Sequence, residues 1–327
     1  MTQDRDVGAH LSSRLRGAET DRALLAKVAR SYYLDAGSKV EIADSLGISR
    51  FRVARLLERA LAEGVVQITI NDDGLDDPVL SAELGEYLGL DECLVVRCYG
   101  DPDQVRAQVG GAAASLLSAT LGEDEVLGLT WGRTLTATTS QLTSLPRCTV
   151  VQLTGSVSGE LGSSPIEIVR QASQRAGGAV YPIFSPLFVD DALTAESLRQ
   201  HPGIKLALDF FDEVTTAVMS VGSWDPQISQ VPEVIPEADV RRARERGCVA
   251  DIAGILIGAD GKLVDPAFQE RCVSISYAQL DAIPRVIAVA SDAGKADAIR
   301  AVTCAGLVSS LVVDHGLAEA LLAGERA

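Results

Sequence analysis

Ser49 and a run of arginines give residues 49–59 side chains suited to binding a negatively charged polymer. Guanidinium groups pair with phosphates and with guanine edges, and a hydroxyl can donate to a phosphate oxygen. Apolar residues recur at helical spacing in the same stretch, which leaves the basic side chains on the opposite face. We expect DNA to contact this face; the alternative is an ordinary helical hairpin with a solvated basic face. The candidate contact residues are Ser49, Arg50, Phe51, Arg52, Arg55 and Arg59.

A second stretch, GLTWGRTLTA at 128–137, has the composition of an anion-binding turn. A predicted strand ending in Gly-x-Thr leads through a bend into a helix, which leaves free backbone N–H groups at the positive end of the helix dipole. Phosphate suits such a turn, which lacks the Gly-Lys-Ser/Thr ending of a Walker loop. A glycine-lined packing turn is the alternative. The candidate ligand residues are Gly128, Thr130, Trp131, Gly132, Arg133 and Thr134.

Two isolated charges lie near other predicted strand ends. Lys295 falls in the first turn of a predicted helix, where a cation opposes the helix dipole unless an anion lies beside it; a solvated surface lysine is the alternative. Asp251 lies inside an apolar run, where a carboxylate needs donors from the backbone or from ligand hydroxyls. Loops of Gly and Ser are weaker candidates, because this composition is common in turns. These loop residues are Gly155, Ser156, Gly222 and Ser223.

Two short helices joined by a tight turn must position the basic face. Ser38 and Glu41 match a capping box, so a helix should begin at Lys39. Gly47 supplies the permissive backbone of a sharp turn, and Ser49 can cap the second helix. This arrangement is typical of a helix-turn-helix, whose second helix presents its N-terminal side chains to base edges.

Apolar spacing predicts which sides of these helices face inward. A third helix, with Leu24, Val28 and Tyr32 at i, i+4 and i+8, should complete the small core, and residues 65–70 alternate like a strand that forms a wing. The inward residues are predicted to be Val40, Ala43 and Leu46 in the first helix and Val53, Leu56, Leu57, Ala60 and Leu61 in the second.

From Pro78 onward, apolar runs of strand length alternate with helical patterns. Most runs are continuously apolar, so we expect an α/β fold with a largely parallel sheet and helices on both faces. A ligand would then bind beyond the carboxyl ends of the strands. The predicted strands are 93–98, 125–130, 149–155, 180–184, 215–220, 248–257, 285–290 and 308–313, and the predicted helices include 79–88, 104–121 and 296–304.

Composition and charge placement limit the class of protein. The chain has 327 residues, 47% of them hydrophobic, and no apolar run of the ~20 residues that a membrane span needs. Residues 1–70 contain eleven Lys and Arg against nine Asp and Glu, while the remainder contains 18 against 36. The acidic remainder would orient the basic end toward DNA. Six scattered cysteines without a C-x-x-C pair favour a cytoplasmic protein. Three histidines far apart in the sequence argue against a metal site or a His-based catalytic triad. We expect no cofactor and no catalytic residues.

The domain boundaries follow from the same patterns. We expect a mobile arm over residues 1–19, a helix-turn-helix domain over 20–70, a charged linker over 71–77 and a ligand-binding domain over 78–327.

The segment VARSYYLDAGSKVEIADSLGISRFRVARLLERALAEGVVQITI resembles the N-terminal domain of the SorC-type sugar-responsive transcriptional regulators. One departure is Ala54, where that family commonly has a serine that could contact DNA. The resemblance extends to about residue 322 through the W-G-x-T turn, P-G-I-x-x-A-L at 202–208, V-G-S-W at 221–224, V-A-D-I-A-G, A-I-P-R-V-I-A-V-A and K-A-x-A-I-R-A.

The resemblance implies a larger domain like the sugar-phosphate isomerases and deaminases, a phosphorylated sugar or polyol as effector, and a homo-oligomer, either a dimer or a tetramer. By position it assigns the phosphate to the W-G-x-T backbone and Lys295, and the sugar hydroxyls to Asp251. We therefore expect a DNA-binding regulator of carbohydrate metabolism that responds to this effector. Two alternatives stay open: a sugar-phosphate isomerase or deaminase with an appended DNA-binding domain, and a larger domain that only oligomerises.

Overall fold

A computed structural model describes residues 22–66, 75–157 and 164–324, which form two compact units, Met1–Asn71 and Asp72–Ala327. The predicted arm over residues 1–19 and positions 67–70 of the predicted wing lie outside the described residues. Among the described residues, no helix has both the length and the apolar character needed to cross a membrane.

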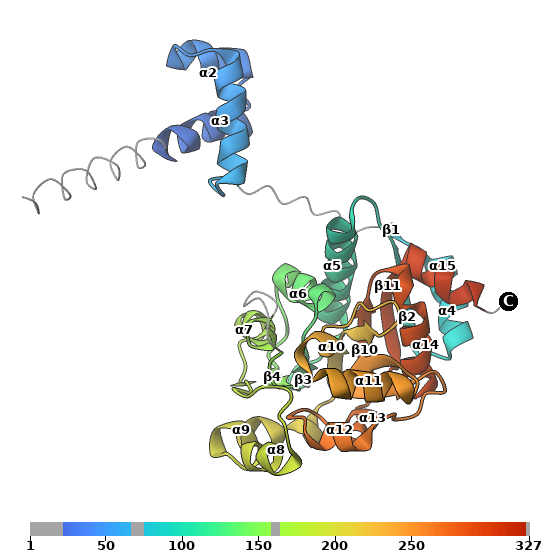
Figure 1. The fold of residues 1–327 in the computed structure, drawn as a ribbon. Helices are drawn as coiled ribbons and strands as arrows, with labels where there is room; N and C mark the ends of the chain where they lie inside the picture. Colours follow the sequence, from blue (N-terminus) through green and yellow to red (C-terminus); the bar gives the residue numbers. More distant parts are fainter. Residues whose placement is uncertain (1–21, 67–74, 158–163, 325–327) are drawn as a thin grey trace, which may run out of the picture. The chain divides into compact units, whose positions relative to one another are not determined.

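The smaller unit contains a helix over residues 22–33, α2 (Lys39–Leu46) and α3 (Arg50–Ala62) (Figure 1). Both predicted caps form: Ser38 and Glu41 make a capping box, and the Ser49 side chain accepts from the backbone N–H of Arg52 at 3.2 Å. Gly47 ends α2 with φ +63°, a conformation that favours glycine. Local signals therefore predicted the start of both helices.

The inward face of α2 differs from the prediction. Val40 is 54% exposed, whereas Ile42 and Ala43 are buried and Leu46 is half-buried. Val40 precedes Ile42 by two residues, which turns it about 200° around the helix and away from α3. In α3 the predicted stripe is buried apart from Leu61, which is 42% exposed at the edge of the stripe.

The larger unit is built on an eight-stranded sheet with the order β1-β2-β11-β10-β6-β3-β4-β5. Every pair is parallel except β1 and β2, which confirms the predicted α/β fold with a largely parallel sheet. The strands are β1 (Leu75–Asp76), β2 (Glu92–Arg97), β3 (Val126–Leu129), β4 (Thr149–Gln152), β5 (Val180–Tyr181), β6 (Thr216–Met219), β10 (Arg285–Ala290) and β11 (Ser310–Asp314).

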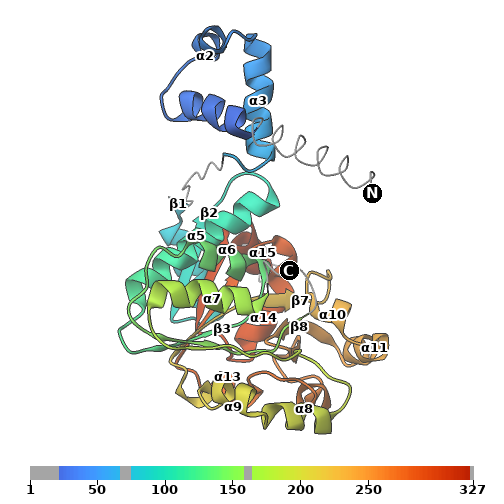
Figure 2. The ribbon, with the colours of Figure 1, turned by 90° about the vertical axis from the view of Figure 1, so that its left-hand side faces the viewer.

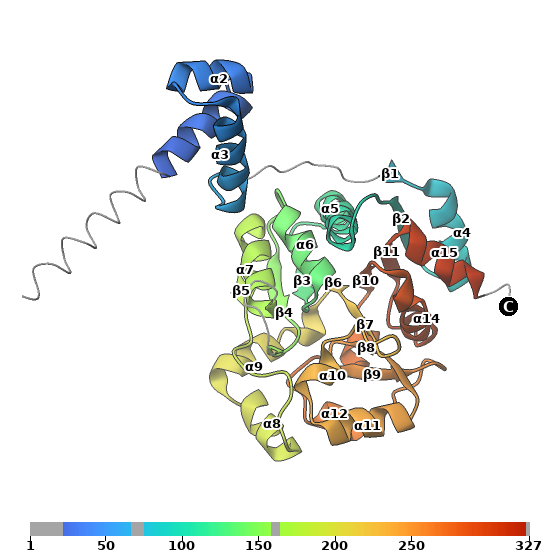
Figure 3. The same ribbon diagram turned by 45° about the horizontal axis from the view of Figure 1, so that its top comes forward.

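Helices cover both faces of this sheet (Figures 1 and 3). Successive residues of β10 point to opposite sides, so Val286 and Ala288 join one apolar cluster while Ile287 and Val289 join the other. The first cluster includes residues of α4 (Pro78–Leu88), α14 (Ala296–Cys304) and α15 (His315–Ala323). The second includes residues of α5 (Pro102–Thr120), α6 (Arg133–Gln141) and α7 (Pro165–Ala176). Burial on both sides explains why these strands read as continuous apolar runs.

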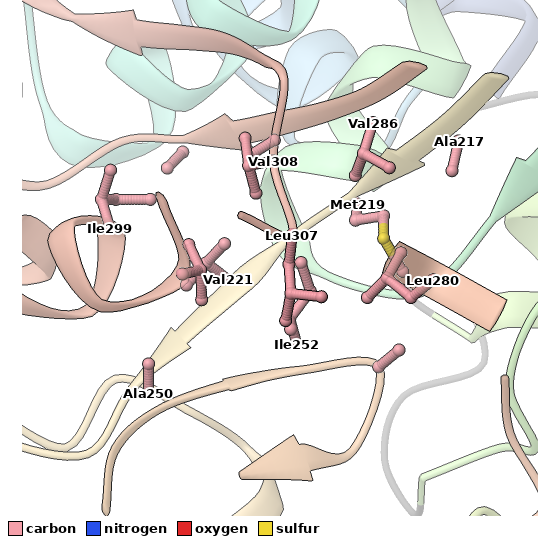
Figure 4. Packing of buried hydrophobic residues seen from close by; sticks show 14 of the residues in the cluster. Ala217, Met219, Val221, Ala250, Ile252, Leu280, Val286, Ile299, Leu307 and Val308 are labelled. Carbon is pink, nitrogen blue, oxygen red and sulfur yellow. The ribbon is translucent and has the colours of Figure 1, made fainter. Parts of the chain in front are cut away.

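A separate three-stranded antiparallel sheet, β7 (Val221–Ser223), β8 (Cys248–Ile252) and β9 (Ile255–Gly258), packs near the carboxyl ends of the large sheet. The sequence predicted one strand over 248–257, but the chain reverses at Ala253 and Gly254, which have φ of +55° and +82°. The strands on both sides of this turn are largely buried, so the apolar pattern continues across the turn and the sequence reads as one strand. Ala250 and Ile252 share a core with Met219 of the large sheet (Figure 4).

The remaining helices follow β5 in the sequence, and α10 and α11 lie beside β7 and β8 (Figure 2). They are α8 (Ala192–Arg199), α9 (Pro202–Leu208), η2 (Phe211–Glu213), α10 (Val231–Val234), α11 (Glu237–Glu245), α12 (Pro266–Glu270), α13 (Tyr277–Asp281) and η3 (Ala293–Lys295).

The C-terminal end of the predicted linker belongs to the larger unit. Leu75 and Asp76 form β1, which pairs with β2, and Asp77 caps α4 through its contact with the N–H of Leu80. The linker assignment of residues 75–77 was wrong, because backbone pairing with β2 gives this polar segment a partner that its composition does not show.

Candidate functional site

A cleft with a cavity volume of about 80 Å³ lies at the carboxyl ends of β3, β6 and β10. These strands are neighbours in the sheet and run parallel, so the residues that follow them meet at one edge. The chain passes from β3 outward to β4 and β5, then returns to the other side of β3 as β6. The cleft therefore occupies the position where ligands bind in open α/β sheets.

The turn from β3 into α6 forms one wall. Gly132 precedes α6 with φ +145°, and a Cβ there would lie 2.1 Å from Ser220 Oγ, so only glycine fits. No side chain in the described part of the chain caps this helix terminus, and the first N–H groups of α6 have no partner within the helix. These N–H groups and the helix dipole favour an anion at this wall.

Two hydroxyl groups in the cleft lack partners. Thr130 follows β3 and Ser220 follows β6, and the oxygen of each hydroxyl is buried without a hydrogen bond to the described residues. Buried polar atoms in proteins are normally hydrogen-bonded, so these two have unused capacity to bind a polar ligand.

Lys295 brings a buried cation to the cleft. It is 9% exposed, and its Nζ donates to the carbonyl oxygen of Val221 at 2.8 Å. Burial, assisted by the positive charge of Arg133, lowers the pKa of Lys295 to about 8, although Asp251 and Asp292 oppose the shift. Lys295 is the last residue of η3 and immediately precedes α14, close to its predicted place in the first turn of a helix. An anion in the cleft would stabilise its charged form.

Asp251 lies opposite in β8 and is 3% exposed. Its Oδ2 accepts from Trp224 Nε1 at 2.9 Å. Burial raises the pKa of Asp251, and hydrogen bonds from Ser229 and Trp224 act against the increase. A Cβ at Gly222 would lie 2.3 Å from Asp251 Oδ2, so glycine is needed for this packing. The carboxyl group can accept hydrogen bonds from ligand hydroxyls.

Backbone strain is present in the cleft. Ala253 has φ +55° and Asp292 has φ +96°, and both residues line it. Non-glycine residues adopt such angles at a cost of about 1–3 kcal/mol, and they cluster at ligand sites. The Asp292 conformation is fixed on one side by its N–H, which donates to Asp314 Oδ2 at 2.9 Å.

The structure brings eight of the twelve predicted ligand residues to the cleft: Thr130, Trp131, Gly132, Arg133, Thr134, Gly222, Asp251 and Lys295. The other four do not line it. Gly128 lies inside β3, where a Cβ would meet the Leu153 side chain at 2.7 Å. Ser223 is fully buried, and its hydroxyl donates to the carbonyl oxygen of Gly294 at 3.3 Å.

Gly155 and Ser156 are committed to backbone pairing away from the cleft. The N–H of Gly155 donates to Val273 O at 2.7 Å, and that of Ser156 donates to Ser185 O at 2.8 Å. The structure therefore does not bring them to the cleft, and local sequence could not show this because their partners are distant in sequence.

Sequence reasoning missed several cleft residues. Ser220 and Ser291 directly follow strands β6 and β10, so the rule that ligands bind at strand ends could have found them. Arg106 comes from α5 and carries no such signal. The full set of missed residues is Arg106, Ser220, Val221, Ile228, Ser229, Gln230, Ala253, Ser291 and Asp292.

In the smaller unit, the basic side chains of α3 lie away from its core. Arg52, Arg55 and Arg59 are exposed, while Val53 and Leu57 are buried on the opposite side. Arg59 pairs with Glu63 at 2.8 Å, which partly neutralises the last turn. The guanidinium groups with the best access therefore lie in the first two turns of the helix.

Comparison with known proteins agrees with both units. A family model described as "Putative sugar-binding domain" matches residues 76–323. EryD, the erythritol catabolism regulatory protein of Brucella abortus (strain 2308), is 26% identical over 313 residues, covering 93% of this chain and 98% of that protein. The transcriptional regulator LsrR of Enterobacter sp. (strain 638) is 28% identical over 317 residues, covering 95% and 96%.

The crystal structure of the full-length sorbitol operon regulator SorC from Klebsiella pneumoniae is similar over 93% of this chain and 99% of that chain, with 25% identity and a TM-score of 0.67. The family model covers most of the chain, and the full-length relatives are transcriptional regulators. The chain belongs to the sugar-binding-domain family and is a SorC-type transcriptional regulator.

Proposed function

We propose that this protein regulates genes of carbohydrate metabolism and that a phosphorylated sugar or polyol in the cleft sets its affinity for operator DNA. The names of EryD and SorC connect those relatives with erythritol catabolism and the sorbitol operon. One observation carries the proposal: the α6 terminus and two hydroxyls, none of which has a side-chain partner among the described residues, meet the buried Lys295 in a single cleft.

The charges in the cleft favour a ligand with one anionic end. Among its described lining residues, Arg106, Arg133 and Lys295 are cationic and Asp251 and Asp292 are acidic. Together with the partial positive charge of the α6 terminus, these residues give the cleft a positive local net charge, although the chain as a whole has a net charge of −16. Phosphate would bind at the α6 terminus beside Lys295. Asp251 would accept from hydroxyls and would repel a second anion.

Effector binding must be coupled to DNA binding. A ligand can change operator affinity only if it binds the DNA-competent and incompetent states unequally. We propose that residues 20–70 bind DNA, that residues 78–327 bind the effector and pair as a dimer or tetramer, and that the filled cleft alters this pairing. Two α3 helices reading successive major grooves must be ~34 Å apart or a multiple of that. The proposal places the protein in the cytoplasm, with the DNA.

A thermal-shift panel tests the ligand class. Matched pairs, such as sorbitol with sorbitol 6-phosphate and ribose with ribose 5-phosphate, would be added to the full-length protein and to Lys295→Met. At 100 times its Kd, a true effector stabilises the protein by about 2.7 kcal/mol, which should raise Tm by several degrees. We expect this only for a phosphorylated member and only in the wild type. Equal shifts from both members of every pair would contradict the phosphate site.

Binding without turnover is the second expectation. The phosphorylated ligand should be recovered unchanged after incubation with the protein, as measured by NMR. Isomerised or deaminated product would favour the alternative enzyme.

A further inference from the structure

Phe51 is the most exposed aromatic side chain in the described part of the smaller unit, with 65% of its surface accessible. The three-helix core is complete without it, since Val53, Leu56, Leu57 and Ala60 are buried against the other two helices. Single exposed apolar side chains are common on protein surfaces, so it is the position of Phe51, more than its exposure, that points to a contact.

The position of Phe51 on α3 makes it central to the outward face. The helix turns by about 100° per residue, so Phe51 and Arg55 lie one above the other, opposite the buried stripe of Val53, Leu57 and Ala60. By the same geometry, Arg50 and Arg52 lie on the two flanks. If α3 enters a major groove, Phe51 and Arg55 face the base edges most directly, and the flanking arginines face the backbones.

Neighbouring side chains constrain Phe51. The guanidinium carbon of Arg50 lies 4.8 Å from the centroid of the Phe51 ring, within the range of a cation–π contact. This contact restrains one side of the ring. Ala54, one turn along, is small and half-buried, so it leaves room beside the ring.

The ring has no hydrogen-bonding group, which limits what it can recognise. The C5-methyl of thymine is the apolar group that a base edge presents in the major groove, and aromatic side chains can contact it. We propose that Phe51 contacts a thymine methyl in each operator half-site and so recognises that base. This proposal rests on the proposed function. Arg55 lies about 5–6 Å away at i+4, and base pairs are spaced about 3.4 Å apart. The thymine therefore lies within two base pairs of the base that Arg55 contacts.

Removal of a single methyl group tests this assignment. Operators would be selected from a random DNA pool by the full-length protein, and each thymine of a half-site would be replaced in turn by deoxyuridine. We expect one position per half-site at which wild-type affinity falls about fourfold, the effect of burying one methyl group. Phe51→Ala should bind more weakly and be insensitive at that position. Leu34→Ala, which removes another exposed apolar side chain, should keep the wild-type sensitivity.

A second measurement uses only the wild-type protein. At the sensitive position, replacement of T·A by C·G should weaken binding, and methylation of that cytosine at C5 should restore about fourfold. Equal affinity for all deoxyuridine operators, or unchanged sensitivity in a folded Phe51→Ala protein, would overturn the role of Phe51 while leaving operator binding intact. Failure of the wild-type protein to select any DNA would overturn the proposed function and this role together.

Discussion

Effector binding should weaken about tenfold when the pH rises from 7 to 9. The pKa of Lys295 is lowered to about 8 in the empty cleft, first by burial and then by Arg133. About nine-tenths of the lysine is charged at pH 7 and about one-tenth at pH 9. If only the charged form holds the phosphate, affinity is complete below pH 8 and is lost above it, at a cost of about 1.4 kcal/mol by pH 9.

Calorimetric titration with the sugar phosphate selected by the thermal-shift panel would measure this effect. The second pKa of a phosphate ester is about 6, so the ligand stays dianionic over most of this range. At pH 9, titrations in buffers of different ionisation enthalpy should show an uptake of nearly one proton by the wild type. Lys295→Met should bind weakly, with no pH dependence over this range and no proton uptake. Equal wild-type affinity at pH 7 and 9, or the same pH dependence in Lys295→Met, would refute the role of Lys295.

Three further substitutions test the cleft, the DNA-binding face and the stability of α2 separately. Gly132→Ala places a Cβ 2.1 Å from Ser220 Oγ at a positive φ. It should lower the free energy of unfolding, measured with denaturant, by about 1–3 kcal/mol and abolish the rise in Tm on adding effector. Unchanged effector binding would contradict the proposed turn. Arg55→Ala should weaken operator binding by about 1–3 kcal/mol in a gel-retardation assay with an unchanged circular dichroism spectrum, and full affinity would remove Arg55 from the interface. Ser38→Ala removes the capping box and should destabilise α2 by about 1 kcal/mol. Operator affinity should therefore be lost at a lower temperature than in the wild type. Asp44→Ala, an exposed substitution in the same helix, is the control.

Local signals predicted the smaller unit well but not which face of α2 is buried. The capping pair of Ser38 and Glu41 placed the start of α2 at the correct residue. Val40 was assigned to the wrong face, because an eight-residue helix contains too few apolar positions to define a single stripe. Burial in such a short helix depends on where α3 and the helix over residues 22–33 lie, which sequence periodicity does not encode.

The strand-end rule predicted most of the anion-binding wall and failed where distant segments pair. Thr130, Gly132 and Lys295 all follow strands of the parallel sheet, so the rule brings them together. Gly155 also follows a strand, yet its backbone pairs with Val273, more than a hundred residues away. Arg106 reaches the cleft from a helix, and no local pattern distinguishes it from other surface arginines.

Operator affinity measured with and without effector tests the central claim most directly. Fluorescence anisotropy with labelled operator DNA would be recorded for the wild type and for Lys295→Met, with the sugar phosphate at saturation for the wild type. We expect the effector to change the wild-type operator Kd by about 5–150-fold, the usual range of allosteric coupling. Lys295→Met should bind the operator as the wild type does without effector and should not respond at that concentration. An effector that binds the wild-type protein and leaves its operator Kd unchanged would contradict the claim that the cleft controls DNA binding.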